Sequence, residues 1–317
     1  MRDVLRRLVA GEITEDEALA EIRAVQLQEL EGRARLDLGR YLRRGLPEVV
    51  LAPGKAPGET ARLAVALAER QGQGLVSRMS EAHRAAVRRA ASAARMTVIE
   101  RAASARLVRE GFTPEAQPGK IGILTAGTSD VPVAEEARMV VEACGLEARL
   151  EADLGVAGLH RFIGPLAAVL EWGADALIVA AGMDGVLPGL VAGLTSVPVI
   201  GLPVSTGYGR GGSGEAALNT MLQSCSTGLV VVNIDNGVGA GAAAVLIANA
   251  ASQRRRRGRI AATTASRIMP ASTDRNHHHA VSRTKAAADG LKKVSAPSAT
   301  SDSTTTSSHG KPRRRRP

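Results

Sequence analysis

The chain has 317 residues, of which 44% are apolar, so it is long enough to bury one large core or two smaller ones. Aromatic residues make up only 2% of it, which argues against a base-stacking surface and favours a core of Ala, Val, Leu and Ile. No apolar run approaches the roughly 18 residues of a membrane span, and the first residues lack the apolar stretch of a signal peptide. We therefore expect a cytoplasmic protein without a membrane partner.

The net charge of +10 is distributed unevenly along the chain. Residues 254–317 contain 16 Lys or Arg and 3 Asp or Glu, whereas residues 1–253 contain 25 basic and 28 acidic residues. The body is therefore slightly acidic, and the positive charge belongs to the C-terminal segment. The two cysteines, Cys144 and Cys225, are too few for a disulfide framework and are expected to stay reduced.

Residues 1–114 are predicted to form a small α+β domain that is rich in helix. The run from Thr14 to Glu17 has the pattern of a capping box at the start of a helix. We expect helices over residues 17–25 and 59–70, and strands over residues 46–51 and 74–77. The segment Glu115-Ala-Gln-Pro118 is the predicted linker to the next domain.

Residues 119–253 show short apolar runs that alternate with helical stretches across Gly-rich turns. The predicted strands are residues 121–125, 147–151, 176–180, 197–202 and 229–233, and the predicted helices are residues 133–143, 159–172, 187–194, 215–223 and 240–251. This βα repeat predicts right-handed crossovers and a parallel sheet. We expect a doubly wound, flavodoxin-like α/β domain that binds its ligand beyond the carboxyl ends of the strands.

Residues 254–317 are predicted to be a disordered basic tail. The segment opens with four arginines, continues in Ser, Thr, Ala, Pro and Lys, and has too little apolar surface to fold alone. Its charge would attract RNA or another polyanion, but only nonspecifically and in a salt-sensitive way. The run His277–His279 has no further ligands at a defined spacing, and we treat it as incidental.

The loop Gly127-Thr128-Ser129-Asp130 follows a predicted strand and precedes a predicted helix. Backbone N–H groups at the start of a helix converge on an anion, so the loop would suit a phosphate. The alternative is an ordinary tight turn in which Asp130 caps the helix. The loop alone leaves both interpretations open.

Two further loops carry polar groups of the same kind. Gly182 would let a ligand approach the backbone closely, and Asp184 would place a carboxylate at the ligand's edge, although Asp184 also suits an ordinary helix cap. His160 and Arg161 lie near the start of another helix, where a lone histidine is more often structural than catalytic.

Cys225 is the candidate nucleophile of the chain. It follows a predicted helix, whose dipole disfavours a thiolate, so the empty protein should not activate it strongly. Cys144, in contrast, is predicted to fill the core. The last strand ends in Asn233, Asp235 and Asn236, which would suit ribose, phosphate or magnesium, or would simply form a polar turn.

These motifs resemble those of the aminoimidazole ribonucleotide carboxylase fold. The residues that carry the resemblance are Thr128-Ser129-Asp130, His160-Arg161 and the loop 181–189. The chain is still more similar to the LarB family, the pyridinium-3,5-biscarboxylic acid mononucleotide synthases of nickel-pincer cofactor biosynthesis. That likeness lies in residues 37–55, 125–136, 155–161, 182–208 and 219–239, and so covers roughly residues 1–252.

The resemblance implies that nicotinic acid adenine dinucleotide is carboxylated at pyridinium C5 by carbon dioxide or bicarbonate, and that its phosphoanhydride is cleaved to release AMP. Cys225 would add to ring C4, and Asp184, where the family usually has Glu, would remove the C5 proton. His160 would position phosphate or carbon dioxide, and Asp235 would help to hold Mg²⁺. The implied substrate-binding residues are Gly127, Thr128, Ser129, Asp130, Arg161, Gly182, Lys55, Asn233 and Asn236.

The resemblance also implies a homo-oligomer, specifically an octamer. Two other functions stay open at this point. One is an aminoimidazole ribonucleotide carboxylase or mutase of purine biosynthesis, which needs neither the thiol nor the N-terminal domain. The other is a noncatalytic nucleotide-binding protein whose basic tail binds RNA.

Overall fold

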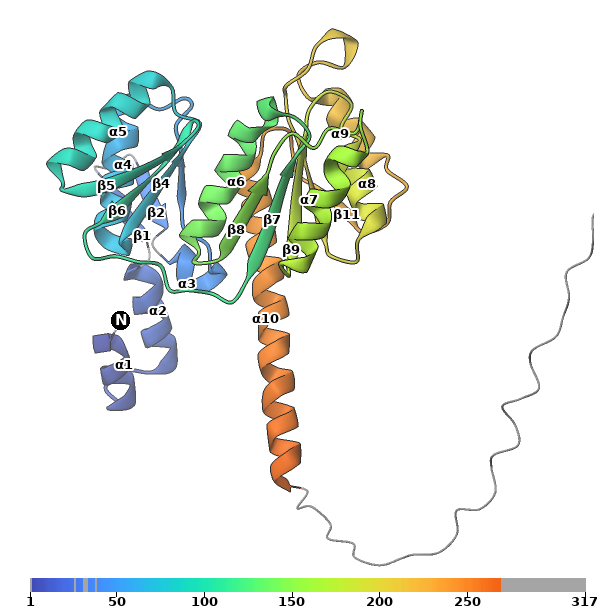
Figure 1. Ribbon diagram of the computed structural model, residues 1–317. Coiled ribbons are helices and arrows are strands. Elements are labelled where there is room, and N and C mark those ends of the chain that lie inside the picture. Colours follow the sequence, from blue (N-terminus) through green and yellow to red (C-terminus); the bar gives the residue numbers. More distant parts are fainter. Residues whose placement is uncertain (1, 26, 31–33, 38, 269–317) are drawn as a thin grey trace, which may run out of the picture. The chain divides into compact units, whose positions relative to one another are not determined.

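The computed structural model of the protein describes residues 2–25, 27–30, 34–37 and 39–268 (Figure 1). Contacts divide the chain into two units, Met1–Ala265 and Ser266–Pro317, and the first of these contains the elements discussed below. Most of the predicted tail and the run His277–His279 lie outside the described residues. None of the described helices is both long enough and apolar enough to cross a bilayer.

The N-terminal part holds a mixed sheet with the order β3-β4-β6-β5. Its strands are β3 (Val49–Leu51), β4 (Gln73–Ser77), β5 (Met96–Arg101) and β6 (Ser104–Arg109). Strands β3 and β4 are parallel, whereas β4–β6 and β5–β6 pair antiparallel. The remaining elements of this part are α1 (Arg2–Val9), α2 (Glu15–Val25), the pair β1 (Leu27–Leu30) and β2 (Ala34–Asp37), α3 (Arg40–Arg44), α4 (Pro57–Gln71) and α5 (Glu81–Ala93).

The second sheet is parallel throughout and has the order β11-β10-β9-β7-β8. Its strands are β7 (Lys120–Thr125), β8 (Glu147–Glu151), β9 (Ala176–Ala181), β10 (Val199–Pro203) and β11 (Leu229–Val231). Numbered within the domain, this order is 5-4-3-1-2, which is the flavodoxin-like arrangement. The predicted fold class is confirmed.

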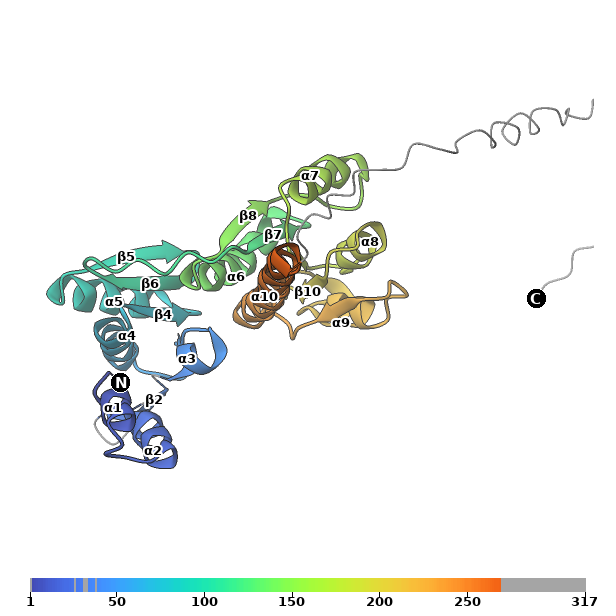
Figure 2. The same cartoon turned by 90° about the horizontal axis from the view of Figure 1, so that it is seen from below.

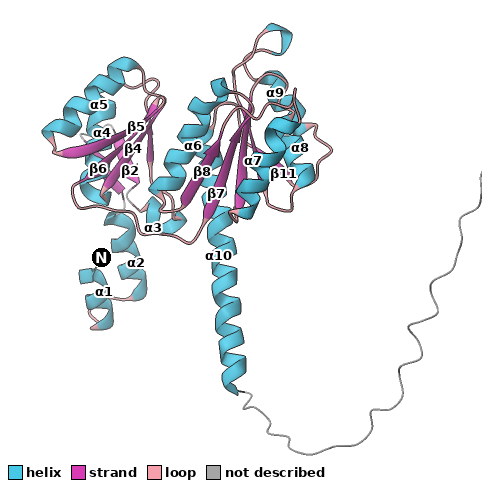
Figure 3. Cartoon of the chain, in the orientation of Figure 1, coloured by secondary structure: helices cyan, strands magenta, loops and turns pink. Residues whose placement is uncertain are grey.

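Helices cover both faces of the parallel sheet, as Figure 3 shows. They are α6 (Val131–Ala143), α7 (His160–Glu171), α8 (Leu187–Leu194), α9 (Glu215–Leu222) and α10 (Gly237–Ile268). Buried side chains of α6 and α10 form one core layer with the strands, and those of α7, α8 and α9 form the other. Because β9 is buried along its whole length, its run of Ala, Leu, Ile and Val is apolar rather than alternating.

The structure differs from the sequence expectations at several points. Helix α10 continues to Ile268, through residues 254–268 of the predicted tail, because Arg and Ala have high helix propensity. The β1–β2 pair and the β5–β6 hairpin lie in a region that is predicted to be mainly helical. Strand β5 is only partly buried and contains Glu100 and Arg101, so its apolar signal is weak.

Helix α6 packs against both sheets, and Figures 1 and 2 show it between them. An apolar cluster joins Leu75 of β4 to Met139, Val140 and Ala143 of α6. The buried Gln73 side chain donates a hydrogen bond of 2.8 Å to the Ala143 carbonyl. The two sheets therefore belong to one compact unit, and the predicted division at residues 115–118 stays a prediction.

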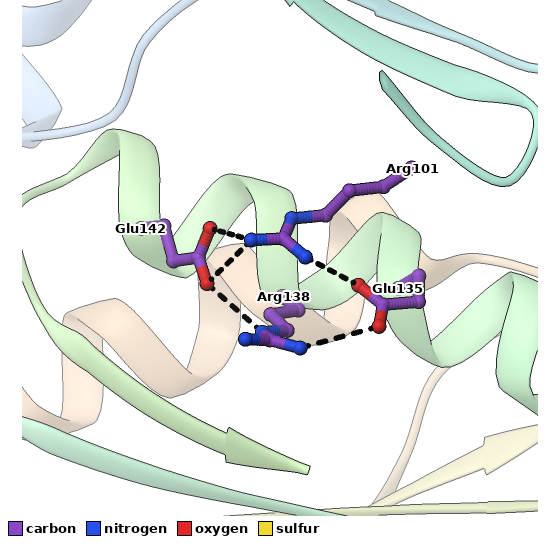
Figure 4. A network of polar contacts seen from close by, with 4 residues as sticks. All are labelled: Arg101, Glu135, Arg138 and Glu142. Carbon is purple, nitrogen blue, oxygen red and sulfur yellow. Dashed lines mark hydrogen bonds and ion pairs between the residues drawn. The ribbon is translucent and has the colours of Figure 1, made fainter. Parts of the chain in front are cut away.

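An ion-pair network closes the rim of this contact (Figure 4). Arg101 of β5 reaches Glu142 at 2.8 Å and Glu135 at 3.4 Å, both on α6. Arg138 bridges the same two carboxylates, at 2.9 Å and 3.3 Å. All four side chains are partly buried, with exposed fractions between 17% and 28%, so solvent screens their charges only partly.

We expect Arg101→Ala to lower the free energy of unfolding by about 1–2 kcal/mol, a value between those of exposed and buried ion pairs. The matched control is Arg88→Ala. Arg88 of α5 forms an ion pair with Glu100 of β5, and its side chain is 55% exposed. Urea denaturation of both variants measures the difference. An equal loss of stability in the two variants would show that the network contributes no more than an exposed ion pair does.

Candidate active site

The loops after β7, β8, β9 and β10 surround a cavity of about 600 Å³ at the carboxyl edge of the parallel sheet. This is the place where a doubly wound sheet binds its ligand. The residues that line the cavity are Ala126, Gly127, Ser129, Asp130, Gly155, Val156, Ala157, Gly182, Met183, Asp184, Leu187, Thr206, Gly207 and Tyr208. Five predicted site residues are thus brought together: Gly127, Ser129, Asp130, Gly182 and Asp184.

Asp130 joins three of these loops. Its side chain is only 3% exposed. Oδ2 accepts a hydrogen bond of 2.9 Å from the Gly127 N–H, and Oδ1 accepts from the Gly182 N–H at 3.2 Å and from the Thr206 hydroxyl at 2.7 Å. Both oxygens are therefore engaged by the protein, and Asp130 shapes the cavity. The ligand contact that we predicted for Asp130 stays a prediction.

Gly182 is a glycine because two loops meet at its Cα. A Cβ at this position would lie 2.2 Å from Thr206 Oγ1 and 2.3 Å from the Thr206 carbonyl oxygen. Any side chain would push Thr206 away from Asp130. Thr206 had no predicted role of its own, although it follows the fourth strand of the βα repeat and lies in the run 182–208 that carries the resemblance.

Asp184 is exposed and lines the cavity, with one weak hydrogen bond of 3.4 Å from the Val186 N–H to Oδ1. This bond keeps the carboxylate at the start of α8 while leaving it accessible to a ligand. The preceding residue, Met183, has a positive φ of 46°, a conformation that non-glycine residues adopt at a cost. Met183 and Tyr208 place exposed apolar surface beside the carboxylate. Neither residue was predicted to be part of the site.

His160 and Arg161 lie beside this cavity but not in its lining. Both are exposed at the start of α7, directly after the lining residues 155–157. Arg161 forms an ion pair with Asp153, which follows β8 and has a positive φ of 64°. Arg161 therefore holds the loop after β8, and a ligand would have to compete with Asp153 for its guanidinium group.

In the loop after β11, the side-chain oxygens that are predicted to bind a ligand accept hydrogen bonds from backbone N–H groups. Asn233 Oδ1 accepts from the Ile234 N–H at 2.9 Å, and Asn236 Oδ1 accepts from the Gly239 N–H at 2.8 Å, which caps α10. Asp235 Oδ1 accepts from the Ser205 N–H at 2.8 Å. Among the described residues, no three His, Cys, Asp or Glu side chains gather as metal ligands. This donor set does not fit a magnesium site built by the protein, and we assign no step to the metal.

Lys55 and Cys225 lie outside the cavity. Lys55 Nζ donates to the Leu51 carbonyl at 3.0 Å, within the N-terminal part. Helix α9 begins beside the Asp184 loop, since a Cβ on Gly185 would lie 2.6 Å from Ala217 Cα. Cys225 follows the other end of α9 and is exposed. The Ser226 hydroxyl beside it donates to the Gly189 carbonyl of α8 at 2.6 Å, so the thiol lies near α8 but is not among the residues that line the cavity.

Comparisons with known proteins identify relatives for both parts of the chain. Residues 120–281 match the AIR carboxylase family, and residues 27–109 match the LarB/PurE-like N-terminal domain. An uncharacterized protein of Methanocaldococcus jannaschii is 40% identical over 250 residues, which are 78% of this chain and 96% of that protein. An N5-carboxyaminoimidazole ribonucleotide mutase of Thermotoga maritima is 28% identical over 40% of this chain and 74% of its own length. The Mycobacterium tuberculosis mutase is 29% identical over 44% of this chain and 79% of its own length.

We expect Asp130→Ala to lower the free energy of unfolding by about 2–4 kcal/mol, because the Gly127 and Gly182 N–H groups and the Thr206 hydroxyl lose their acceptor. Asp130→Asn should cost less, since it keeps one accepting oxygen. The control is Asp184→Asn, which should change stability by less than about 0.5 kcal/mol at this exposed position. Chemical denaturation measures all three, and an unchanged Asp130→Ala midpoint would contradict the role of this carboxylate.

The two cysteines should differ in reactivity. Burial raises the pKa of the Cys144 thiol to about 12, so it stays protonated and shielded at neutral pH, whereas Cys225 is exposed. We expect iodoacetamide at pH 8 to alkylate Cys225 in the folded protein and Cys144 only after denaturation. Peptide mass spectrometry reports both sites, and modification of native Cys144 would contradict its burial.

Proposed function

The chain belongs to the LarB-like, AIR carboxylase-like family, and on that premise we propose that it carboxylates the pyridinium ring of nicotinic acid adenine dinucleotide at C5. Cleavage of the phosphoanhydride by water would then give AMP and pyridinium-3,5-biscarboxylic acid mononucleotide. The observation that carries the proposal is the LarB/PurE-like N-terminal domain, which accompanies a carboxylase-type domain that holds Asp184 in its cavity.

The proposed chemistry reverses the polarity of the ring. The Cys225 thiolate forms a bond to C4, and the pyridinium becomes a neutral dihydropyridine whose C5 is an enamine carbon. C5 then attacks carbon dioxide to form a new C–C bond and a carboxylate. Asp184 removes the C5 proton, the C–S bond breaks, and the thiolate leaves as the aromatic cation is restored. No external oxidant or reductant is needed.

The cationic ring supports the first of these steps. A positive ring within about 4–6 Å of the thiol favours the thiolate, so the substrate would help to activate its own nucleophile. The cavity offers the apolar surfaces of Val156, Met183 and Tyr208 for the ring, and the Ser129 hydroxyl for a phosphate oxygen. Asp184 lies among these groups, as a carboxylate that accepts the C5 proton must.

The position of Cys225 adds a requirement to the proposal. Because this thiol lies outside the cavity of its own chain, we assign the covalent step to Cys225 of a neighbouring copy. A homo-oligomer with composite sites meets this requirement, since a closed symmetric assembly repeats the same contact at every site.

A second candidate function is the N5-carboxyaminoimidazole ribonucleotide mutase reaction. Similarity to two such mutases favours it, at 28% and 29% identity. These matches cover only 40% and 44% of the chain, however, and leave the N-terminal domain without a role. An assay with N5-carboxyaminoimidazole ribonucleotide tests this alternative directly.

The decisive experiment incubates the purified chain with nicotinic acid adenine dinucleotide, ¹³C-bicarbonate and magnesium, followed by mass spectrometry. We expect AMP together with a labelled dicarboxylated mononucleotide. Cys225→Ala and Asp184→Asn should each lose carboxylation, whereas Asp184→Glu, which restores the usual family residue, should keep or raise it. Turnover by Cys225→Ala would eliminate the covalent route, and turnover of the purine precursor alone would replace the proposed substrate.

Mixing the two inactive chains tests the composite site. Coexpressed Cys225→Ala and Asp184→Asn chains would pair an intact thiol with an intact carboxylate in about a quarter of the sites of a symmetric assembly. We expect partial activity from this mixture and none from either chain alone. Complete inactivity of a verified mixed oligomer would place both groups of each site in the same chain.

A further inference from the structure

A second cavity, of about 470 Å³, adjoins the first. The two cavities share Ser129 and Thr206 in their linings. The second one receives residues from both sheets, because Arg78 and Ser104 come from the N-terminal part whereas Asp235 follows β11 of the parallel sheet. The N-terminal part therefore forms one wall of a hollow that continues the candidate active site.

Arg78 brings a cation to this hollow. Its guanidinium group donates a hydrogen bond to the Asp235 carbonyl, and the residue is exposed. It forms no ion pair with any carboxylate among the described residues. Because a guanidinium carries five N–H donors in a fixed fork, several of them stay available for a phosphate.

The backbone on both sides of this contact is strained. Arg78 and Asp235 each have a positive φ of 56°, although neither is a glycine. Such conformations persist only where the surrounding structure enforces them, and they cluster at ligand sites. Here they aim two loops from different sheets at the same hollow.

The other polar groups suit a nucleotide. Glu136 lines the cavity, but its carboxylate already accepts from the Ser77 hydroxyl and the Val238 N–H, so its charge is engaged. Asp235 has one oxygen on the Ser205 N–H, and its carboxylate would accept from ribose hydroxyls, as acidic residues do in dinucleotide sites. Ser104 and Ser205 add hydroxyls to the lining of the same cavity.

We propose that the second cavity binds the adenylate half of the dinucleotide substrate, with Arg78 holding the adenylate phosphate. The pyridinium half occupies the first cavity, and the phosphoanhydride passes the shared residues Ser129 and Thr206. This assignment rests on the proposed function for the identity of the first half. It gives the N-terminal part a positioning role that a mononucleotide substrate would not require.

The test is calorimetric titration of the full chain with nicotinic acid adenine dinucleotide, nicotinic acid mononucleotide and AMP. Arg78→Ala should lower the affinity for the dinucleotide and for AMP by about tenfold or more, as the loss of a charged hydrogen bond predicts. It should change the affinity for the mononucleotide by less than about twofold. Arg78→Lys should recover part of the loss, because an ammonium keeps the charge without the fork. The matched control is Arg62→Ala, since exposed Arg62 on α4 lines neither cavity.

A second variant leaves the charge in place. Ala103 lines only the second cavity, so Ala103→Trp should fill it and exclude AMP while the mononucleotide still binds. Unchanged AMP affinity in both variants, or competition between AMP and the mononucleotide for one site, would overturn the proposal. If AMP binding depends on Arg78 but no carboxylated product forms, the proposed reaction fails and the adenylate site stands. If product forms and Arg78→Ala binds AMP normally, only the adenylate site fails.

Discussion

The candidate site depends on the hydrogen bonds of one buried carboxylate, that of Asp130. A charge that is 3% exposed costs several kcal/mol in desolvation unless hydrogen bonds replace its water. Three donors from three loops do so here, and each is a Gly N–H or a hydroxyl at the carboxyl edge of the sheet. The same bonds that keep the charge buried also fix the distances between the loops. A ligand therefore meets a cavity whose shape is set before it binds.

The second constraint is the shared helix α6. Its first turn follows the Asp130 loop, its C-terminal half packs against Leu75 of the N-terminal sheet, and its carboxylates pair with Arg101. The buried Glu136 connects Ser77 of β4 to the start of α10. Because these contacts hold β4 beside α6, the loop that follows β4 and carries Arg78 lies at the same cavity rim as Asp235. The packing on α6 thus holds Arg78 and Asp235 in their strained backbone conformations at the rim of the cavity, where a ligand would bind.

The sequence predicted the parallel sheet well because its central strands β7, β9 and β10 are buried almost throughout and glycine turns bound the strands. Strand β8 and helix α8 match their predicted bounds. It missed the β5–β6 hairpin, since a partly exposed strand with charged residues lacks a distinct apolar run. In the site, the predicted residues that directly follow strands lie at one edge of the sheet, as parallel topology requires, and their roles stay predictions. The hydrogen bonds that join Asp130 to Gly182 and Thr206 were not predictable, because hydrogen bonds between loops leave no pattern in the local sequence. Lys55 and Cys225 were grouped with the site by resemblance rather than by topology.

Topology also explains why the thiol lies apart from the carboxylate. In a βα repeat, a helix leaves the carboxyl edge of the sheet and returns the chain toward the amino edge of the next strand. Asp184 precedes α8 and Cys225 follows α9, a helix of eight residues or about 12 Å. The Ser226 hydroxyl beside Cys225 donates to the Gly189 carbonyl of α8, so the thiol lies next to the side of α8 rather than in the lining of the cavity. Under the proposed function, a second chain brings a thiol to the carboxylate. An exposed cysteine at the end of a helix that packs beside the cavity is well placed to serve a neighbour's site rather than its own.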